Sequence, residues 1–120
     1  MKPKNPDSEE WQQIFVCQWL KREYPDVWFY AVPNGGYRGK KEAGMLKAGG
    51  ASAGVPDLCF PGLFLYVEMK KEKGGVVSDS QKRWLRGLES FGYTVAIAKG
   101  FEDFKNVFKA IYEAPRKRLV

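Results

Sequence analysis

The segment GVPDLCFPGLFLYVEMK, residues 54–70, contains two largely apolar runs around the pair Pro61-Gly62. Such runs on either side of a turn pair predict an antiparallel hairpin. In a chain of 120 residues a hairpin is expected to line the core, yet Asp57, Glu68 and Lys70 interrupt its apolar pattern. The fold must therefore accommodate two acids and a lysine within its sheet.

Alternation along the two strands predicts that these three side chains share one face. A two- or four-residue loop centred on the Pro-Gly pair sets Asp57 opposite Tyr66, and paired residues lie on the same face. Glu68 and Lys70 follow Tyr66 at intervals of two, so Glu68 becomes the diagonal neighbour of Asp57, about 7–8 Å away. The opposite face is apolar and consists of Leu58, Phe60, Leu65, Val67 and Met69. A three- or five-residue loop would reverse the parity.

Two carboxylates and a lysine on one face can bind a cation and activate a water molecule. Asp57 and Glu68 can bind one hard divalent cation, Mg²⁺ or Mn²⁺. Lys70 lies one strand repeat beyond Glu68, close enough to act on a water bound to that cation. The alternative for each motif alone is structural, since Glu-x-Lys also occurs as a solvated pair at strand ends and Pro-Asp occurs in turns.

The absence of histidine narrows the chemistry further. It excludes Ser-His and Cys-His nucleophile pairs and the usual histidine-containing zinc sites. Cys17 and Cys59 lie in apolar segments without metal-ligand spacing, which favours buried free thiols over a disulfide. A hydrolase of this composition must activate water through a carboxylate-bound cation, a lysine, or both.

The remaining sequence predicts one α/β domain, a mixed sheet of about four strands flanked by helices. No apolar run is long enough to span a membrane and no signal-peptide pattern occurs, so a soluble cytoplasmic protein without a nucleotide cofactor is expected. The core is expected over about 8–113, followed by a basic tail at 114–120. The expected elements are a helix at 8–23 capped by Ser8, a strand at 27–32, a short helix at 40–48, the hairpin, a helix at 78–92, a strand at 93–99 and a helix at 101–113.

Polar residues on two of the expected helices can reach the charged face. Gln81 has capping-box spacing from Ser78 and also lies on the helical stripe that faces the sheet, and the two roles are compatible. Glu9 precedes the buried stripe of the first helix, where it can orient a metal-bound water or bind a second metal ion. Glu10 is a rival for that role, and favourable placement in a first helical turn accounts for either acid without a site.

The net charge of +6 favours an anionic partner such as nucleic acid. The segment 33–54 is rich in glycine and contains one acid, and Gly35 and Gly36 would let its backbone approach DNA closely. The cations expected to contact phosphates are Arg38, Lys40, Lys41, Lys47, Lys71, Lys73, Lys82 and Arg83. A solvated surface loop is the alternative. No recognition helix or zinc finger is evident, so recognition of DNA shape is expected.

Trp11, Phe15 and Trp19 form a second apolar stripe on the first helix. An exposed aromatic stripe on a small domain usually marks an interface, which makes these residues a candidate dimer surface. The alternative is that the C-terminal helix covers them within one chain.

These motifs together resemble a known family. The segments SEEWQQ, VPNGG, GVPDL, VEMKKEKGGVVSDSQKRWL and GYTVAIAKGFED are similar to a stand-alone VRR-NUC domain, of the PD-(D/E)xK nuclease superfamily, from about Ser8 to Tyr112. The resemblance implies a restriction-endonuclease-like core and metal-dependent phosphodiester hydrolysis. Compact stand-alone members resemble Holliday junction resolvases, which implies a homodimer acting on branched DNA in repair or recombination.

The resemblance also implies roles for individual residues. Asp57 and Glu68 match the metal-binding acids, with the backbone carbonyl of Met69 as a further ligand. Lys70 matches the catalytic lysine, which positions or deprotonates the attacking water. Gln81 matches the glutamine of the following helix, which orients the lysine or a phosphate oxygen.

Two further matches to the family concern the first helix and the glycine-rich loop. Glu9 and Gln13 match the polar pair of the first helix, and Asn34 begins the glycine pair of the DNA-contacting loop. The family name suggests Val-Arg-Arg where this chain has VEMK, and that departure falls on Met69, which points to the opposite face. A flap or single-strand nuclease, and a DNA-binding module of the same fold without chemistry, are the alternative functions.

Overall fold

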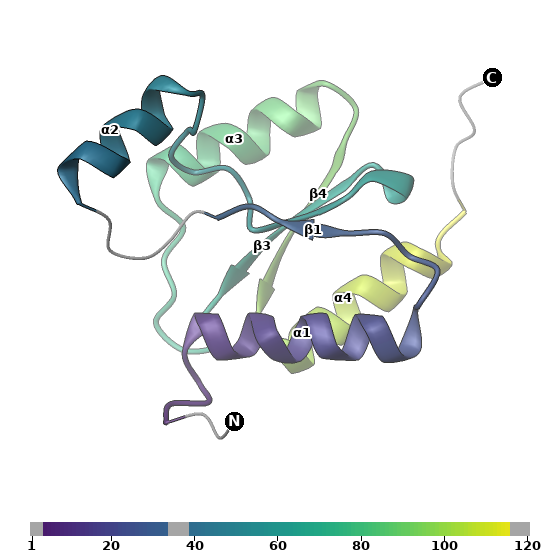
Figure 1. Ribbon diagram of the computed structural model, residues 1–120. Coiled ribbons are helices and arrows are strands. Elements are labelled where there is room, and N and C mark those ends of the chain that lie inside the picture. The colour runs from purple at the N-terminus through teal and green to yellow at the C-terminus, as the bar shows by residue number, and fades with distance from the viewer. Residues whose placement is uncertain (1–3, 34–38, 116–120) are drawn as a thin grey trace.

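The computed structural model describes residues 4–33 and 39–115, and it is an α/β fold. A four-stranded sheet in the order β1-β2-β3-β4 lies between helices (Figure 1). β1 pairs with β2 and β2 with β3 in antiparallel fashion, whereas β3 and β4 are parallel, so the predicted mixed sheet is confirmed. In chain order the elements are α1 (Glu9–Glu23), β1 (Tyr30–Ala31), α2 (Lys40–Ala48), β2 (Leu58–Phe60), a 3₁₀ turn (Pro61–Leu63), β3 (Leu65–Lys70), α3 (Asp79–Ser90), β4 (Thr94–Lys99) and α4 (Phe101–Glu113).

The core lies between the sheet and the pair α1 and α4, which cover its lower face in Figure 1. Val16 and Leu20 of α1 are fully buried. Phe104 and Phe108 of α4 are also fully buried. They meet the predicted apolar face of the hairpin, which is Leu58, Phe60, Leu65, Val67 and Met69. No helix among the described residues has the length and hydrophobicity that crossing a membrane requires.

The helix ends follow the predicted capping signals. The Ser8 hydroxyl accepts a hydrogen bond from the backbone N–H of Trp11 at the start of α1. At α3, Ser78 and Gln81 form a reciprocal capping box, in which each side chain accepts from the backbone N–H of the other. These caps satisfy donors that the first turn of a helix otherwise leaves without partners.

The first strand is shorter than the predicted 27–32. Only Tyr30 and Ala31 pair with β2, and Trp28 is 82% exposed. β2 ends at Phe60, where Pro61 begins the 3₁₀ turn, so in this register residues 27 and 28 have no strand residue opposite them. A sheet ladder cannot extend beyond the strand that it pairs with.

The hairpin keeps the predicted parity, but its register differs by two residues. The 3₁₀ turn and Phe64, which adopts a left-handed conformation, form a four-residue connection, so Phe60 pairs with Leu65 and Leu58 with Val67. Continuing this ladder by one residue sets Asp57 directly opposite Glu68, where the predicted register set it opposite Tyr66. The two acids are therefore closer than a diagonal pair.

The stripe of Trp11, Phe15 and Trp19 is not an exposed aromatic surface. Trp19 is buried at 6% exposure and packs edge-on against Phe104 and Phe108 of α4. Trp11 and Phe15 are half-buried. Trp19 therefore does not present the exposed ring that the predicted dimer surface needs, and the alternative, coverage by the C-terminal helix, applies to Trp19.

Both cysteines are free thiols, as predicted. Cys59 is buried in β2, and Cys17 is half-buried on α1, less enclosed than expected.

Candidate active site

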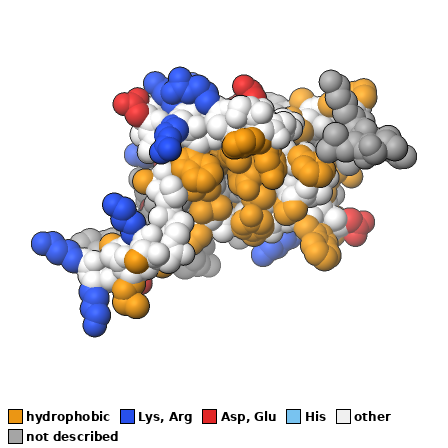
Figure 2. Space-filling model, turned by 90° about the horizontal axis from the view of Figure 1, so that it is seen from above, with side chains coloured by type: hydrophobic (Ala, Val, Ile, Leu, Met, Phe, Trp, Pro, Cys, Tyr) orange, Lys and Arg blue, Asp and Glu red, His pale blue; other side chains and the backbone are white. Residues whose placement is uncertain are grey.

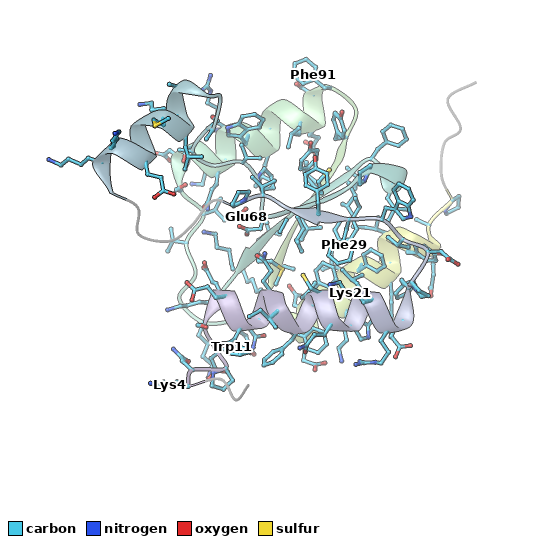
Figure 3. All side chains as sticks on the ribbon, viewed as in Figure 1. Lys4, Trp11, Lys21, Phe29, Glu68 and Phe91 are labelled. Atoms are coloured by element: carbon cyan, nitrogen blue, oxygen red, sulfur yellow. The ribbon has the colours of Figure 1, made fainter. Side chains whose placement is uncertain are left out.

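The face of the sheet opposite α1 and α4 carries a buried acid at its centre. Glu68 lies on β3 and is 2% exposed, although a lone buried carboxylate is costly to desolvate. Figure 3 shows it in the interior, between the sheet and α3. One of its oxygens, Oε1, accepts a 2.6 Å hydrogen bond from the Gln81 side chain. The other, Oε2, is buried and has no hydrogen-bond partner.

Asp57 is the nearest acidic neighbour of Glu68. Its Oδ2 accepts a 2.8 Å hydrogen bond from the backbone N–H of Met69, so the aspartate is held against β3. Burial raises the pKa of Asp57 above its ordinary value, and the hydrogen bond from Met69 opposes that rise. Burial and then the adjacent Asp57 charge raise the pKa of Glu68 to about 8. The pair therefore retains a proton at neutral pH when no cation is bound.

Lys70 completes the predicted trio. It is the last residue of β3 and is 7% exposed, and its Nζ lies 3.9 Å from Oε1 of Glu68. The structure therefore brings Asp57, Glu68 and Lys70 onto one face within reach of one another, as the hairpin parity predicts. A buried ammonium beside two acids offsets part of their mutual repulsion.

Gln81 caps α3 and faces the sheet, as predicted, but its partner on the sheet is Glu68 and not the predicted Lys70. Its Oε1 accepts from the backbone N–H of Ser78 at 2.8 Å, while its Nε2 donates to Glu68. The first hydrogen bond is part of the capping box at the start of α3, and the second connects that helix to Glu68 on β3. A single amide side chain thus fixes both the helix start and the orientation of the Glu68 carboxylate.

The start of α3 is held in place by Gly54, a residue that the sequence did not single out as functional. Gly54 has a φ of +92°, and a Cβ at this position would lie 2.5 Å from the backbone carbon of Ser80. Only glycine allows this approach, which brings the segment before Asp57 against the first turn of α3. The Gly-Val-Pro-Asp order was the available signal, but the sequence cannot show that its contact is a distant helix.

The first helix contributes Glu9 at the margin of the site. Glu9 Oε1 accepts from the backbone N–H of Lys71, directly after β3, at 3.4 Å, and its charge contributes to the raised pKa of Asp57. The rival Glu10 is exposed. Gln12 is a second polar side chain of α1 that contacts a distant segment, and it accepts from the backbone N–H of Phe101 at 2.7 Å at the start of α4. Gln12 was missed because no sequence pattern pairs it with a helix start 89 residues later.

Asp57 and Glu68 fit a cation that keeps some of its water. Among residues 4–33 and 39–115, no three His, Cys, Asp or Glu side chains lie close enough to form a ligand cluster by themselves. The two acids therefore supply two protein ligands, and water, substrate or backbone oxygens must complete the shell, which is how Mg²⁺ is usually bound. The unpaired buried Oε2 of Glu68 is the observation that fits such an ion.

The predicted DNA-contacting cations within the described residues are exposed. Figure 1 shows α2 projecting from the same side of the molecule as the segment between β3 and α3. No residue of α2 is buried, and the segment after it is joined to α3 by a 3.3 Å hydrogen bond from the Trp84 indole to Ser52. The exposed cations are Lys40, Lys41 and Lys47 on α2, Lys71 and Lys73 after β3, and Lys82 and Arg83 on α3. The predicted contacts Asn34, Gly35, Gly36 and Arg38 lie outside the described residues.

Comparisons with known proteins agree with this architecture. The model of the VRR-NUC domain matches residues 7–102. A solved structure described as a VRR_NUC domain protein superposes with a TM-score of 0.73 at 24% sequence identity, covering 92% of this chain and 90% of that one. No curated protein matches the chain significantly. Because the family model covers most of the sequence, the chain belongs to the VRR-NUC family of nuclease-type domains.

Proposed function

We propose that this protein is a Mg²⁺- or Mn²⁺-dependent endodeoxyribonuclease of the PD-(D/E)xK type. The observation that carries the proposal is the buried pair of Asp57 and Glu68, in which one carboxylate oxygen has no partner and Lys70 lies beside it. A binding module gains nothing from two acids placed where a phosphate must approach. A metal-dependent hydrolase needs both of them.

The two acids would bind the catalytic cation. Asp57 and Glu68 would hold the ion, with the backbone carbonyl of Met69 as the third protein oxygen. When bound, the ion would lower the pKa of a water ligand and offset negative charge that develops on the phosphate. The Met69 N–H and the Gln81 amide each fix one oxygen of an acid, and the two carboxyl groups also contact each other.

Lys70 is the group that would act on the nucleophile. Its ammonium lies beside Glu68 and points along the same face, so it can orient the attacking water or accept its proton after losing its own to solvent. Attack forms the new phosphorus–oxygen bond, and the bond to the leaving sugar oxygen breaks. Glu9, at the margin, would orient a further water or recruit a second ion.

Binding of the substrate would rely on phosphates. The exposed lysines of α2 and the exposed Lys71 and Lys73 after β3 would supply those contacts. Such contacts carry no sequence information, so DNA shape would be recognised. We propose a four-way junction as the preferred substrate and a homodimer as the acting form, because paired incisions across a junction need two sites.

One experiment separates this proposal from its alternatives. Labelled four-way junction, flap, single-stranded and duplex DNA are each incubated with Mg²⁺, Mn²⁺ or EDTA, with Asp57→Asn as the inactive control. The asparagine keeps an acceptor for the Met69 N–H and removes the charge. Symmetric, metal-dependent cuts in the junction support the proposal, while flap products or ladders contradict the junction assignment. Junction binding without any cleavage contradicts the enzymatic function.

A further inference from the structure

We propose that the active-site face carries a stacking platform for an unpaired DNA base next to the phosphate that is cut. The tyrosine platform is defined as Tyr30 on β1, Tyr66 on β3 and Tyr93, which directly precedes β4. The inference rests on the proposed nuclease function, and it names the feature of DNA structure that the site recognises.

The register of the sheet places the tyrosine platform beside the two acids. Tyr30 pairs with Cys59 and Cys59 pairs with Tyr66, so these side chains form a row across β1, β2 and β3 on one face. Glu68 follows Tyr66 by two residues and therefore lies on the same face, about 6.6 Å further along the strand. Asp57 precedes Cys59 by two residues and has the same relation to the row. A ligand that reaches the acids is thus within reach of the tyrosines.

Side-chain contacts join the three tyrosines into one surface. The Tyr93 ring packs edge-on against the Tyr66 ring, and the ring centroids are 5.5 Å apart. The hydroxyl groups of Tyr66 and Tyr30 interact with each other and with the buried Cys59 thiol. The tyrosine platform therefore continues without a break from β1 to the start of β4.

The tyrosine platform is partly open to solvent and uncharged. Tyr30 is 51% exposed and Tyr93 is 37% exposed, whereas Tyr66 is half-buried. Burial and then the contact with Cys59 raise the pKa of Tyr66 above its ordinary value, so its hydroxyl keeps its proton. Figure 2 shows apolar side chains, a class that includes tyrosine in its colouring, gathered across the middle of the face seen from above. Charged side chains surround them.

The neighbouring acids determine which part of DNA meets the tyrosine platform. When Asp57 and Glu68 engage a phosphate through a cation, the base attached to that phosphate lies within about one nucleotide of the acids. Neutral rings give a phosphate no opposite charge, whereas they stack on the flat face of any base. The chain supplies cations for phosphates on other elements, such as the exposed Lys71 and Lys73. The occupant that fits an aromatic surface at this place is therefore a base.

Stacking on the tyrosine platform needs a base whose face is open. In a continuous duplex the neighbouring pairs cover both faces of each base, and opening one costs unstacking energy. At a branch point or a single-stranded segment, a base lacks its neighbour on one side. The tyrosine platform therefore favours DNA that carries such a base next to the cut, which gives recognition of DNA shape a physical basis.

The test measures DNA affinity in EDTA, so that cleavage plays no part. Fluorescence anisotropy compares a junction that has unpaired thymidines at its branch point with a continuous duplex of equal length. We expect Tyr30→Leu to weaken junction binding by about fivefold or more, which is the effect of removing one stacking ring. Tyr30→Phe retains the ring and should bind the junction as wild type does. Affinity for the duplex should be the same in all three proteins.

An exposed ring away from the acids provides the matched control. Phe91 is 81% exposed, and Figure 3 shows it at the outer end of α3. It lies about 15 Å along that helix from Gln81, which contacts Glu68. Phe91→Leu should therefore leave junction affinity unchanged. Tyr93→Leu is a second platform variant, which decides the matter if thermal unfolding shows that Tyr30→Leu does not fold.

A direct reading of stacking comes from 2-aminopurine, whose fluorescence falls when the base stacks. Placed in the unpaired segment, it should be quenched by wild type and by Tyr30→Phe, and it should stay bright with Tyr30→Leu. Junction affinity that Tyr30→Leu and Tyr93→Leu both leave intact overturns the inference. An equal loss in Phe91→Leu, in Tyr30→Phe or on the duplex also overturns it.

The proposed function fails separately from the tyrosine platform. Ring-dependent junction binding by a wild type that cuts nothing in Mg²⁺ or Mn²⁺ retains the tyrosine platform and rejects the nuclease. Metal-dependent cleavage together with junction binding that does not depend on Tyr30 or Tyr93 rejects the tyrosine platform alone.

Discussion

Gln81 donates a 2.6 Å hydrogen bond to Oε1 of Glu68, and the amide oxygen of the same side chain accepts from the backbone N–H of Ser78 in the capping box of α3. The acid at the centre of the sheet is therefore oriented by the first turn of a helix that follows it by thirteen residues. This relationship makes the geometry of the site depend on how α3 starts.

We expect Gln81→Ala to lower cleavage and metal affinity by about 10–100-fold, the usual effect of removing a group that orients a metal ligand. Ser78→Ala is the matched control, because it removes the hydroxyl that accepts from the Gln81 N–H but leaves the contact to Glu68. That variant should lose about 1 kcal/mol of stability and retain its cleavage rate. Single-turnover cleavage and thermal unfolding of both variants check the prediction. Equal losses of activity in the two would show that only the helix cap matters.

Gly54→Ala is expected to destabilise the protein by at least about 2 kcal/mol, since a new Cβ would overlap the Ser80 backbone at a left-handed φ. Gly62→Ala is the control, because nothing lies within 4 Å of a Cβ there. Denaturant unfolding of both variants measures the difference. A Gly54→Ala variant as stable as wild type would mean that α3 can shift away from residue 54. Such a shift would move Gln81 away from Glu68, and cleavage should then fall.

The sequence was sufficient to predict the fold class and the placement of three charged residues on one face of the sheet. Both depend on the alternation of apolar and polar side chains along each strand. The parity of one hairpin brings Asp57, Glu68 and Lys70 together whatever the exact register, and the burial of Glu68 follows from its central strand. The register itself was not predictable, since the turn uses Phe64 in a left-handed conformation that no propensity favours.

Contacts between distant segments account for the other differences. The sequence predicted Trp19 as an interface residue, whereas the rings of α4 cover it. The spacing of aromatic residues along α1 is the same whether they contact a partner subunit or a helix of their own chain. Gln12 and Gly54 act on elements far along the chain, and a single sequence contains no signal of such partners. The exposed rings of Trp28 and Phe91 were likewise indistinguishable from core residues by composition.

The lysines of α2 should determine how DNA affinity depends on salt. Removing one phosphate contact reduces the slope of log affinity against log salt by about one, so Lys47→Gln should show this change. Lys21→Gln is the charge-matched control, because Lys21 is exposed near the far end of α1 from Glu9 (Figure 3). Fluorescence anisotropy on a junction at several salt concentrations measures both. Identical slopes in the two variants would remove α2 from the binding surface.

Metal binding should depend on pH through Glu68. Its pKa of about 8 in the metal-free fold exceeds its ordinary value of 4.5, so a bound cation must displace a proton. Apparent Mg²⁺ affinity should therefore rise by up to about tenfold per pH unit towards pH 8 and then level off.

The same shift predicts how stability changes. A raised carboxyl pKa favours the folded state below pH 4.5, and that contribution is lost as the pH rises to about 8, where the folded protein also releases the proton. The metal-free melting temperature should thus decline over this interval, Mg²⁺ should reverse the decline, and Glu68→Gln should flatten it because glutamine does not titrate. Calorimetry of wild type and variant between pH 5 and 9, with and without Mg²⁺, measures all three. Parallel curves for the two proteins would place the retained proton on another group and leave Glu68 ionised throughout.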